Sequence, residues 1–248
     1  MNDAVPPRPR LIEASGLVLS AFFNAAPMDL QLAAGEHWLI SGPPASGKTT
    51  LARTLLGLIS PQHGQLRLFG HDLDATPGRQ LLALRRNAAF LQAVDGDGLF
   101  PAWSAFDNLA LSLRQHDPER YVQHGALLDT LVHAARRYGI PEGWLDEPVA
   151  MRTRQQRTAI AVWRALQTHP ALVVIDGLTL DQNLLGNALD VDRLLADALE
   201  KHPAIIVLAA ENAPPLPPQL HPETFRRGRM QGGRLEWQAM EPELSPHA

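Results

Sequence analysis

The sequence has no cysteine and almost no lysine. Without cysteine, the 248-residue chain can form no disulfide, no thiolate nucleophile and no cysteine-ligated zinc or iron–sulfur site. Lys48 and Lys201 are its only lysines, so all but two of the 22 basic residues are arginine. Arginine suits bidentate pairing with carboxylate or phosphate, and each of the two lysines therefore needs its own explanation.

Long apolar runs and an excess of positive charge are also absent. The runs LVVI and AIIVLAA fall far short of the roughly 20 residues that cross a bilayer, and the segment MNDAVPPRPRLIEA has no apolar core of a secretory signal. The net charge is −4, whereas nucleic-acid binding domains are usually basic. With 45% hydrophobic residues, the chain is expected to be globular, with no nucleic-acid partner and at most a peripheral membrane role.

The hydrophobic pattern passes from strands to helices and back to strands. Short strands are predicted at residues 11–19, 28–32, 37–41 and 65–69, with a helix at 48–59. Residues 101–166 are predicted to be a helical insertion, strongest at 108–114, 126–138 and 155–166. The apolar runs at 171–176 and 204–209 are typical of buried parallel strands, with a helix at 184–200 between them. The segment APPLPPQLHP excludes a helix or central strand after residue 212, and residues 241–248 are predicted to be a loose tail.

A glycine-rich segment between the strand at 37–41 and the helix at 48–59 matches the pattern Gly-x-x-x-x-Gly-Lys-Ser/Thr of a phosphate loop: Gly42, Pro43, Pro44, Ala45, Ser46, Gly47, Lys48 and Thr49. The glycines let backbone N–H groups approach phosphate oxygens, and the helix N-terminus, with Thr50, adds its positive dipole end. Lys48 is predicted to contact the β- and γ-phosphates, and the Thr49 hydroxyl to ligate Mg²⁺. The alternative is a purely structural glycine-rich turn.

Asp176 ends the apolar run at 171–176, where the Mg²⁺-holding acid of a P-loop enzyme belongs. The alternative role of this residue is a turn or helix-capping aspartate after a strand. Together with the phosphate loop and the buried apolar runs, it predicts an α/β P-loop NTPase core with a mainly parallel sheet. These two motifs alone do not separate a transport ATPase from a small-molecule kinase.

The order of features from about Arg8 to Gly233 resembles the nucleotide-binding subunit of ABC transporters. The matching stretches are AAGEHWLISGPPASGKTTLARTLLGLISPQHGQLRLFGHDL, AAFLQ, GLFPAWSAFDNLAL and WRALQTHPALVVID. The resemblance implies a RecA-like core with a small antiparallel β subdomain and a helical insertion subdomain. These would form one ATP-binding domain at 8–233, with the helical subdomain at about 101–166 and a C-terminal tail at 234–248. The FLQ and LFPAWSAFDNLALSLR stretches look most like the Mce or Mla type of phospholipid transporter.

The same resemblance implies cofactors, partners and further site residues. The cofactors are ATP and Mg²⁺, and the partners are a membrane permease and a second ATP-binding subunit, in a homodimer or a heterodimer on the cytoplasmic face of the inner membrane. Gln92 corresponds to the Q-loop glutamine that touches Mg²⁺ and the attacking water. Phe22 or Phe23 would stack on adenine, although both also suit a core position. Asp181 resembles the D-loop aspartate.

The signature region departs from the family pattern. ABC ATPases carry Leu-Ser-Gly-Gly-Gln at the start of the helix before the strand that ends in the Mg²⁺-holding aspartate, here the run at 171–176, whereas residues 149–157 contain neither glycine. A gap-free match places Thr153 at the serine position, and aligning QQRTAIA with the family's QQRVAIA instead requires an insertion before WRAL. In this family, bare backbone at the signature approaches the γ-phosphate of the nucleotide bound by the partner subunit, and either alignment puts bulky side chains there. Arg152, Arg154 and Arg157 would supply phosphate contacts there or form a solvated helix start.

The catalytic positions also depart from the family. Gly177 occupies the position of the glutamate that acts as general base, a group worth about 10²–10⁴-fold in rate. Glu211 stands near the switch histidine position, either as a carboxylate near the γ-phosphate or as an ordinary loop acid, and His202 lies at the opposite end of that strand. We therefore expect an ATP-binding transporter subunit with impaired hydrolysis. The alternatives are a nucleotide-gated scaffold or regulator outside transport and, with less support, a small-molecule kinase.

Overall fold

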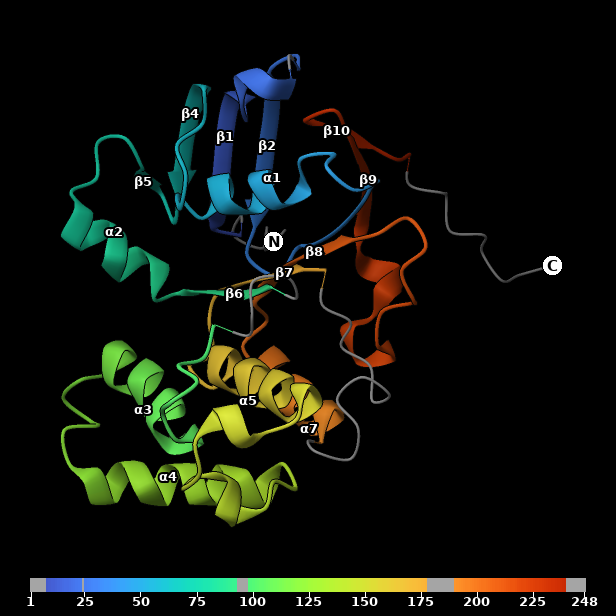
Figure 1. The fold of residues 1–248 in the computed structure, drawn as a ribbon. Coiled ribbons are helices and arrows are strands. Elements are labelled where there is room, and N and C mark those ends of the chain that lie inside the picture. Colours follow the sequence, from blue (N-terminus) through green and yellow to red (C-terminus); the bar gives the residue numbers. More distant parts are fainter. Residues whose placement is uncertain (1–7, 24, 93–97, 178–189, 240–248) are drawn as a thin grey trace, which may run out of the picture.

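The main sheet of the molecule is mostly parallel. The computed structural model describes residues 8–23, 25–92, 98–177 and 190–239. Within these residues the main sheet has six strands in the order β10-β9-β3-β8-β7-β6 (Figure 1). They are β3 (His37–Ser41), β6 (Ala88–Gln92), β7 (Leu172–Asp176), β8 (Ala204–Ala209), β9 (Arg226–Gln231) and β10 (Arg234–Trp237). Neighbouring strands are parallel except β9 and β10. The predicted α/β fold with a mainly parallel sheet is confirmed.

The two apolar runs of the sequence form the centre of this sheet. Every residue of β7 is buried, and so is every residue of β8 except its last. Strands covered on both faces lose the usual alternation of polar and apolar residues, which is why these runs are continuous. Their carboxyl ends therefore meet at one edge of the sheet, where polar side chains can be brought together.

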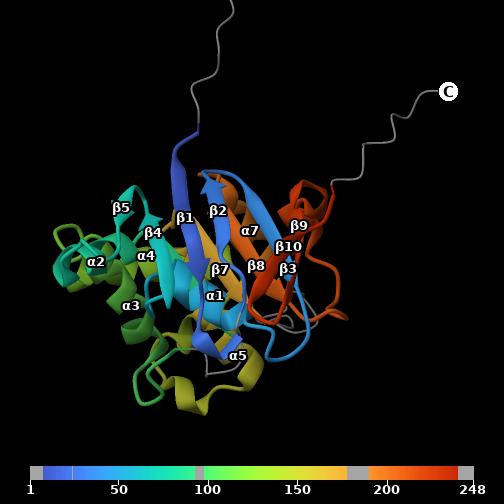
Figure 2. The same ribbon diagram turned by 90° about the horizontal axis from the view of Figure 1, so that it is seen from above.

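A second, antiparallel sheet has the order β2-β1-β4-β5. Its strands are β1 (Arg10–Val18), β2 (Met28–Ala33), β4 (His63–Leu68) and β5 (His71–Asp72), and the short helix η1 (Ala21–Phe23) joins β1 to β2. Helix α1 (Lys48–Leu55) buries Leu51 and Leu55 in a core shared with both sheets. Figure 2 shows this sheet lying over α1, and β9 and β10 beside β3.

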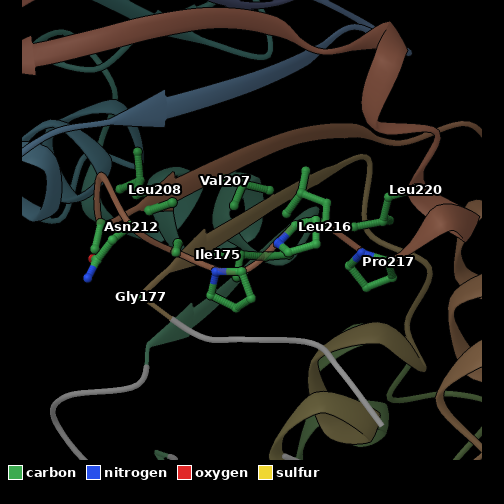
Figure 3. A pocket seen from close by; sticks show the side chains of 13 residues that line it. Ile175, Gly177, Val207, Leu208, Asn212, Leu216, Pro217 and Leu220 are labelled. Atoms are coloured by element: carbon green, nitrogen blue, oxygen red, sulfur yellow. The ribbon is translucent and has the colours of Figure 1, made fainter. Parts of the chain in front are cut away.

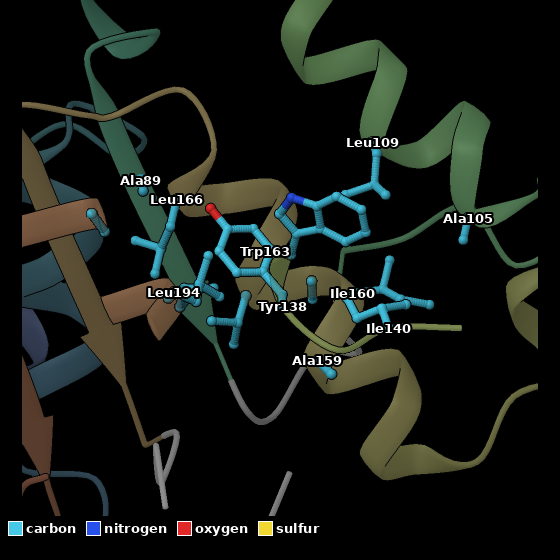
Figure 4. Close-up of a cluster of buried hydrophobic side chains, with 14 of the residues drawn as sticks. Ala89, Ala105, Leu109, Tyr138, Ile140, Ala159, Ile160, Trp163, Leu166 and Leu194 are labelled. Atoms are coloured by element: carbon cyan, nitrogen blue, oxygen red, sulfur yellow. The ribbon is translucent and has the colours of Figure 1, made fainter. Parts of the chain in front are cut away.

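The helical part of the chain lies on the other side of the main sheet (Figure 1). It contains α3 (Ala105–His116), α4 (His124–Arg137) and α5 (Arg154–Leu166), with the short helices η2 (Glu142–Trp144) and η3 (Val149–Met151). Outside this part, α2 (Gly78–Arg85) precedes β6 and α7 (Val191–Leu199) precedes β8. The hydrophobic core of the helical part includes Leu109 of α3 and Ile160 and Trp163 of α5 (Figure 4). Within the described residues, no helix has both the length and the apolar composition needed to cross a bilayer.

A polar contact fastens the helical part to α7. Arg137 at the end of α4 donates two hydrogen bonds to the carboxylate of Asp197, the first from Nε at 2.6 Å, and the Tyr138 hydroxyl donates a third at 3.1 Å. The hydrogen bonds from Arg137 lower the pKa of Asp197 despite its partial burial. Burial, followed by the charge of Asp197, raises the pKa of Tyr138 to about 12. Both groups thus keep their usual charge state at neutral pH, and the contact persists there.

Two boundaries and one segment differ from the sequence predictions. Helix α1 ends at Leu55 rather than residue 59, because Gly57 has φ +63° and a left-handed residue ends the helix. The tail predicted from residue 234 was placed too early, because residues 234–237 form β10 and pair with β9. The proline-rich segment at 213–222, where no helix is expected, contains the single-turn 3₁₀ helix η5 (Pro218–Leu220), and a second one, η6 (Pro222–Thr224), begins at its last residue; each has proline in its first turn, where the missing N–H is tolerated. Of the helix predicted at 184–200, residues 184–189 lie outside the described residues, as does Asp181.

Candidate functional site

The polar residues singled out in the sequence lie at one edge of the main sheet. The strand register pairs Gln92 with Asp176 and Ser41 with Ala209, so the carboxyl ends of β3, β8, β7 and β6 are level. The loop after Ser41 is the predicted phosphate loop. In open sheets with parallel strands, ligands bind at this edge.

The glycines of the loop are required by close backbone approaches. A Cβ on Gly42 would lie 2.3 Å from the carbonyl oxygen of Met230 on β9, which leaves no room for a side chain. Gly47, just before α1, has φ +102°, and a Cβ there would lie 3.2 Å from the ring of Phe23. The backbone N–H of Gly233 donates to the Ser46 carbonyl at 2.9 Å. The β9–β10 turn therefore packs against the loop and fixes its shape.

Lys48 holds its ammonium group at the centre of the loop. Its Nζ donates to the carbonyl oxygens of Gly42 at 2.7 Å and Pro43 at 2.8 Å, and to Ser46 Oγ at 3.2 Å. Partial burial lowers the pKa of Lys48, and the negative charges of Asp176 and Glu211 oppose that shift. A cation ringed by backbone N–H and C=O groups at a helix N-terminus is suited to hold phosphate oxygens.

Two of the three predicted metal ligands, Thr49 and Gln92, donate hydrogen bonds to the same oxygen atom of the third, Asp176. Thr49 Oγ1 donates to Asp176 Oδ2 at 2.7 Å, and Gln92 Nε2 donates to the same oxygen at 3.3 Å. Arg53 Nη2 contacts Gln92 Oε1 at 3.4 Å and orients the amide. Asp176 is only 7% exposed.

This donor set fits Mg²⁺. Hydroxyl, carboxylate and amide oxygens are hard ligands, and Mg²⁺ in phosphate sites is usually held by one or two protein carboxylates with phosphate and water completing its shell. The described residues contain no group of three His, Cys, Asp or Glu that would hold a metal by itself. Thr49 and Asp176 therefore suit a metal ion that arrives together with a phosphate ligand.

The comparisons with known proteins agree with this geometry. A family model described as ABC transporter matches residues 25–179. The chain belongs to the ABC transporter family. Similar ABC proteins include the molybdate/tungstate import ATP-binding protein WtpC of Pyrococcus horikoshii, 31% identical over 62% of this chain and 41% of its own length. The cytochrome c biogenesis ATP-binding export protein CcmA of Pseudomonas syringae pv. tomato is 30% identical over 85% of this chain and 93% of its own length.

Solved ABC structures resemble the whole domain. The dimeric post-hydrolysis state of the ATP-binding cassette MJ0796, bound to ADP and phosphate, matches with a TM-score of 0.69 and 17% identity, over 94% of this chain and 100% of that chain. At this identity the likeness establishes the fold alone, which is that of a P-loop NTPase. The chain spans about two fifths of the length of the first curated relatives it matches, namely 41%, 43% and 40%.

The two phenylalanines proposed to stack on adenine have different environments. Phe23 is partly buried, and its ring packs against the backbone of Gly47 and Gly233. Phe22 is 85% exposed and meets the Phe23 ring edge to face, with centroids 5.5 Å apart. Phe23 therefore supports the phosphate loop, and Phe22 offers the more open ring.

Gly177, which the sequence comparison predicts at the catalytic-glutamate position, has apolar surroundings. Gly177 has φ +68°, and its N–H donates to the Leu208 carbonyl at 2.9 Å. It borders a cavity of about 290 Å³ formed with Val207, Leu216 and the proline-rich segment (Figure 3). None of the described side chains that line this cavity is titratable. The cavity wall therefore offers no general base.

Glu211, near the ABC switch histidine position, is held in an ion pair. Its Oε1 lies 2.6 Å from Arg229 Nη2, which comes from β9 and was not anticipated from the sequence. His202 lies before β8, at the opposite edge of the sheet from the phosphate loop, as the sequence order indicated. Neither residue occupies the place of a free general base beside Lys48.

Residues 149–157, predicted to take the place of the ABC signature, contain the start of helix α5. Thr153 caps the helix by accepting a hydrogen bond from the Gln156 N–H at 3.2 Å, while Gln156 Oε1 accepts from the Thr153 N–H at 3.0 Å. Arg152 pairs with Glu147 at 2.9 Å, and Arg157 Nη1 donates to the Arg152 carbonyl at 3.0 Å. Arg152 and Arg157 therefore stabilise the start of the helix, whereas Arg154 is exposed.

Sequence reasoning missed an aromatic pair on the helical side. Phe100 and Trp103 are both exposed, and their rings stack with centroids 4.5 Å apart. The buried Asn108 side chain fixes their loop, accepting from the Phe100 N–H at 2.7 Å and donating to the Ser104 carbonyl at 2.9 Å. The Val149 N–H donates to the Trp103 carbonyl at 2.9 Å, which joins this loop to the signature region.

Proposed function

We propose that this protein is the ATP-binding subunit of an ABC transporter, and that it binds Mg–ATP but hydrolyses it slowly. The observation that carries the proposal is the convergence of Thr49 and Gln92 on Asp176 beside the loop that encloses Lys48. The phosphates of ATP would lie on the backbone N–H groups of residues 45–50, since Pro43 and Pro44 have none, with Lys48 on the β- and γ-phosphates. The bound Mg²⁺ supplies charge neutralisation of the phosphate oxygens, and Thr49, Asp176 and Gln92 would hold it.

Slow hydrolysis is proposed from the catalytic positions. Gly177 offers no carboxylate, and Glu211 is paired with Arg229. A positioned general base contributes about 10²–10⁴-fold in rate, while its loss leaves nucleotide contacts intact. The missing signature glycines would weaken contacts to the nucleotide of a partner subunit. Binding and turnover are therefore expected to separate in this protein.

The proposed partners are a second ATP-binding subunit and a membrane permease. In a heterodimer with a competent paralogue, the phosphate loop of this chain would meet a normal signature, whereas in a homodimer both sites would meet the signature of residues 149–157. Phe100, Trp103 and Met151 are exposed apolar residues on two segments that are joined by the hydrogen bond from the Val149 N–H to the Trp103 carbonyl. We propose that the permease docks on these residues, which would make the protein peripheral on the cytoplasmic face of the inner membrane.

The proposed cargo class is phospholipid. It rests on the resemblance of the FLQ and LFPAWSAFDNLALSLR stretches to Mce- or Mla-type transporter subunits. The test is to purify the full chain from membranes, weigh the intact complex by mass spectrometry and identify copurifying lipids. Copurification of a permease, lost on Trp103→Ser and retained in the control Val122→Ser at another exposed apolar residue, supports the transporter role.

The scaffold alternative predicts a different result from the same preparation. A nucleotide-gated regulator would copurify with no membrane protein and would change shape in solution when Mg–ATP is added. Transfer of phosphate to a metabolite would instead support a kinase. No observation at the site favours either alternative over the transporter subunit.

A further inference from the structure

A second, wider cavity lies at the edge of the main sheet opposite the phosphate loop. Its volume is about 960 Å³. It is bordered by the first residues of β3 and β9 and by the turn before β8, whereas the phosphate loop follows the last residue of β3. Because a strand rises about 3.3 Å per residue, the two places are roughly 13 Å apart along β3. A ligand of this cavity would therefore be separate from the nucleotide.

The cavity lining is strongly basic. It contains three arginines and three histidines: Arg8, Arg10, Arg226, His37, His202 and His221. The only carboxylate among the described lining residues is Glu36, whose Oε2 is engaged by the Ala33 N–H at 2.8 Å. A lining with this excess of donors and positive charge favours an anion.

Two of the arginines have no carboxylate partner within the described residues. Arg10 pairs with Glu13 at 3.0 Å, but neither Arg8 nor Arg226 takes part in an ion pair there. The guanidinium of Arg226 lies 4.0 Å from the centre of the Trp237 ring, which holds the side chain in place while leaving its N–H groups available. Guanidinium groups are suited to bind phosphate through paired hydrogen bonds, and Arg8 and Arg226 both line this cavity.

His37 adds a fixed polar group to the cavity. Its ring stacks on Phe225 with centroids 5.0 Å apart, and its buried Nδ1 has no hydrogen-bond partner in the described structure. Burial lowers the pKa of His37, and the charges of Arg8 and His221 lower it further. A neutral imidazole can still donate one N–H to an anion. The described residues contain no cluster of His, Asp or Glu suited to a metal, which separates this site from a cation site.

We propose that this cavity is a second ligand site, which binds a soluble, multiply charged phosphate compound between Arg8 and Arg226. The volume lies within the range of small-molecule sites, about 300–1,000 Å³. The concave shape suits a solute rather than the flat surface of a membrane.

The test uses the full chain carrying Lys48→Ala, so that the phosphate loop contributes little, with inorganic pyrophosphate as the probe. Calorimetric titrations compare Arg8→Gln and Arg226→Gln with the control Arg227→Gln, the next residue on β9 and outside this cavity. We expect each lining variant to weaken binding at least fivefold and the control to change it less than twofold. In NMR spectra the ring signals of His37 and His202 should move, while His71 on β5 should not.

Arg8 is exposed and makes no ion pair within the described residues, so Arg8→Gln tests the site even if Arg226→Gln disturbs folding through Trp237. Pyrophosphate that fails to bind the Lys48→Ala protein would overturn the proposal. Equal affinity in the Arg8→Gln variant, or ring shifts confined to histidines outside the cavity, would overturn it too. ATP binding by the protein with native Lys48 is measured separately, so these outcomes do not depend on the proposed transporter role.

Discussion

Thr49 and Asp176 are 127 positions apart in the sequence, yet the Thr49 hydroxyl donates a 2.7 Å hydrogen bond to the Asp176 carboxylate. The bond joins the first turn of α1 to the end of β7, two elements that the parallel register brings to one edge of the sheet. The same carboxylate oxygen accepts from Gln92. A single charged atom therefore organises the proposed metal site.

Replacing that carboxylate should remove the metal dependence of nucleotide binding. Asp176→Asn keeps the shape and a hydrogen-bond acceptor for Thr49 but removes the charge that would face Mg²⁺. We expect Mg–ATP affinity to fall at least about tenfold, or 1.4 kcal/mol, with metal-free ATP binding unchanged. Fluorescence titration with and without Mg²⁺ measures both values. Asp74→Asn, at an exposed aspartate after β5, is the control, and an equal loss in metal-free binding would contradict the assigned role.

Gly177→Glu tests whether a missing base limits hydrolysis. The left-handed φ of +68° should cost the variant roughly 1–2 kcal/mol of stability. The added carboxylate should nevertheless raise the hydrolysis rate of the purified membrane complex at least tenfold, because even an imperfectly placed base should recover part of the about 10²–10⁴-fold that a positioned base contributes. Gly177→Gln carries the same strain without the base and should give no gain. A folded Gly177→Glu protein as slow as Gly177→Gln would show that another step is limiting.

Substitutions of Phe22 and Phe23 should affect different properties, namely nucleotide binding and protein stability respectively. Phe23→Ala removes a ring packed on Gly47 and Gly233, so we expect the free energy of unfolding to fall by about 2 kcal/mol, less than for a fully buried phenylalanine. Phe22→Ala should leave stability nearly unchanged and weaken ATP binding about two- to tenfold if Phe22 stacks on adenine. Urea denaturation and ATP titration of both variants decide the matter. Loss of affinity in Phe23→Ala alone, at unchanged stability, would assign adenine stacking to Phe23 instead.

The contact between Arg137 and Asp197 should make stability depend on pH at the acidic end. The pKa of Asp197 is lower in the folded state than its ordinary value of 3.8, so its contribution is fully present above about pH 4 and is lost as the pH falls through the lower, folded-state pKa. We expect Asp197→Asn to be less stable than the native protein by a constant amount between pH 5 and pH 7, because the Asp197 carboxylate stays ionised throughout that range. That difference should shrink below about pH 4. Thermal unfolding across this range measures it, and a difference that grows on acidification would contradict the predicted direction.

Several parts of the fold were predictable because their signals are local. Strands β7 and β8 are continuous apolar runs, and the phosphate loop is a short motif between a strand and a helix, so neither depends on distant residues for recognition. The apolar spacing at 108–114 predicts a helix, and α3 covers these residues, extending to Ala105 and His116. The convergence of Gln92 on Asp176 followed from the family resemblance and from the parallel register.

Other features depend on tertiary contacts that leave little trace in the sequence. Strand β9, RRGRMQ, has exposed arginines around the buried Gly228 and Met230. Because the segment is so highly charged, its pairing with β3 is not recognisable from the sequence. The approach of the Met230 carbonyl to Gly42 and the pairing of Glu211 with Arg229 both arise from that placement. The basic cavity likewise gathers residues from distant segments. Only folding brings them together.

The most direct test of the central claim is equilibrium binding of Mg–ATP to the native chain and to Lys48→Ala, with hydrolysis followed in the same samples and Lys201→Ala as the matched lysine control. Lys201 is exposed at the turn before β8, far along the chain from the loop. The account predicts ATP binding by the native chain and by Lys201→Ala, loss of binding in Lys48→Ala, and negligible turnover by all three. Robust hydrolysis that persists in Lys48→Ala would contradict it.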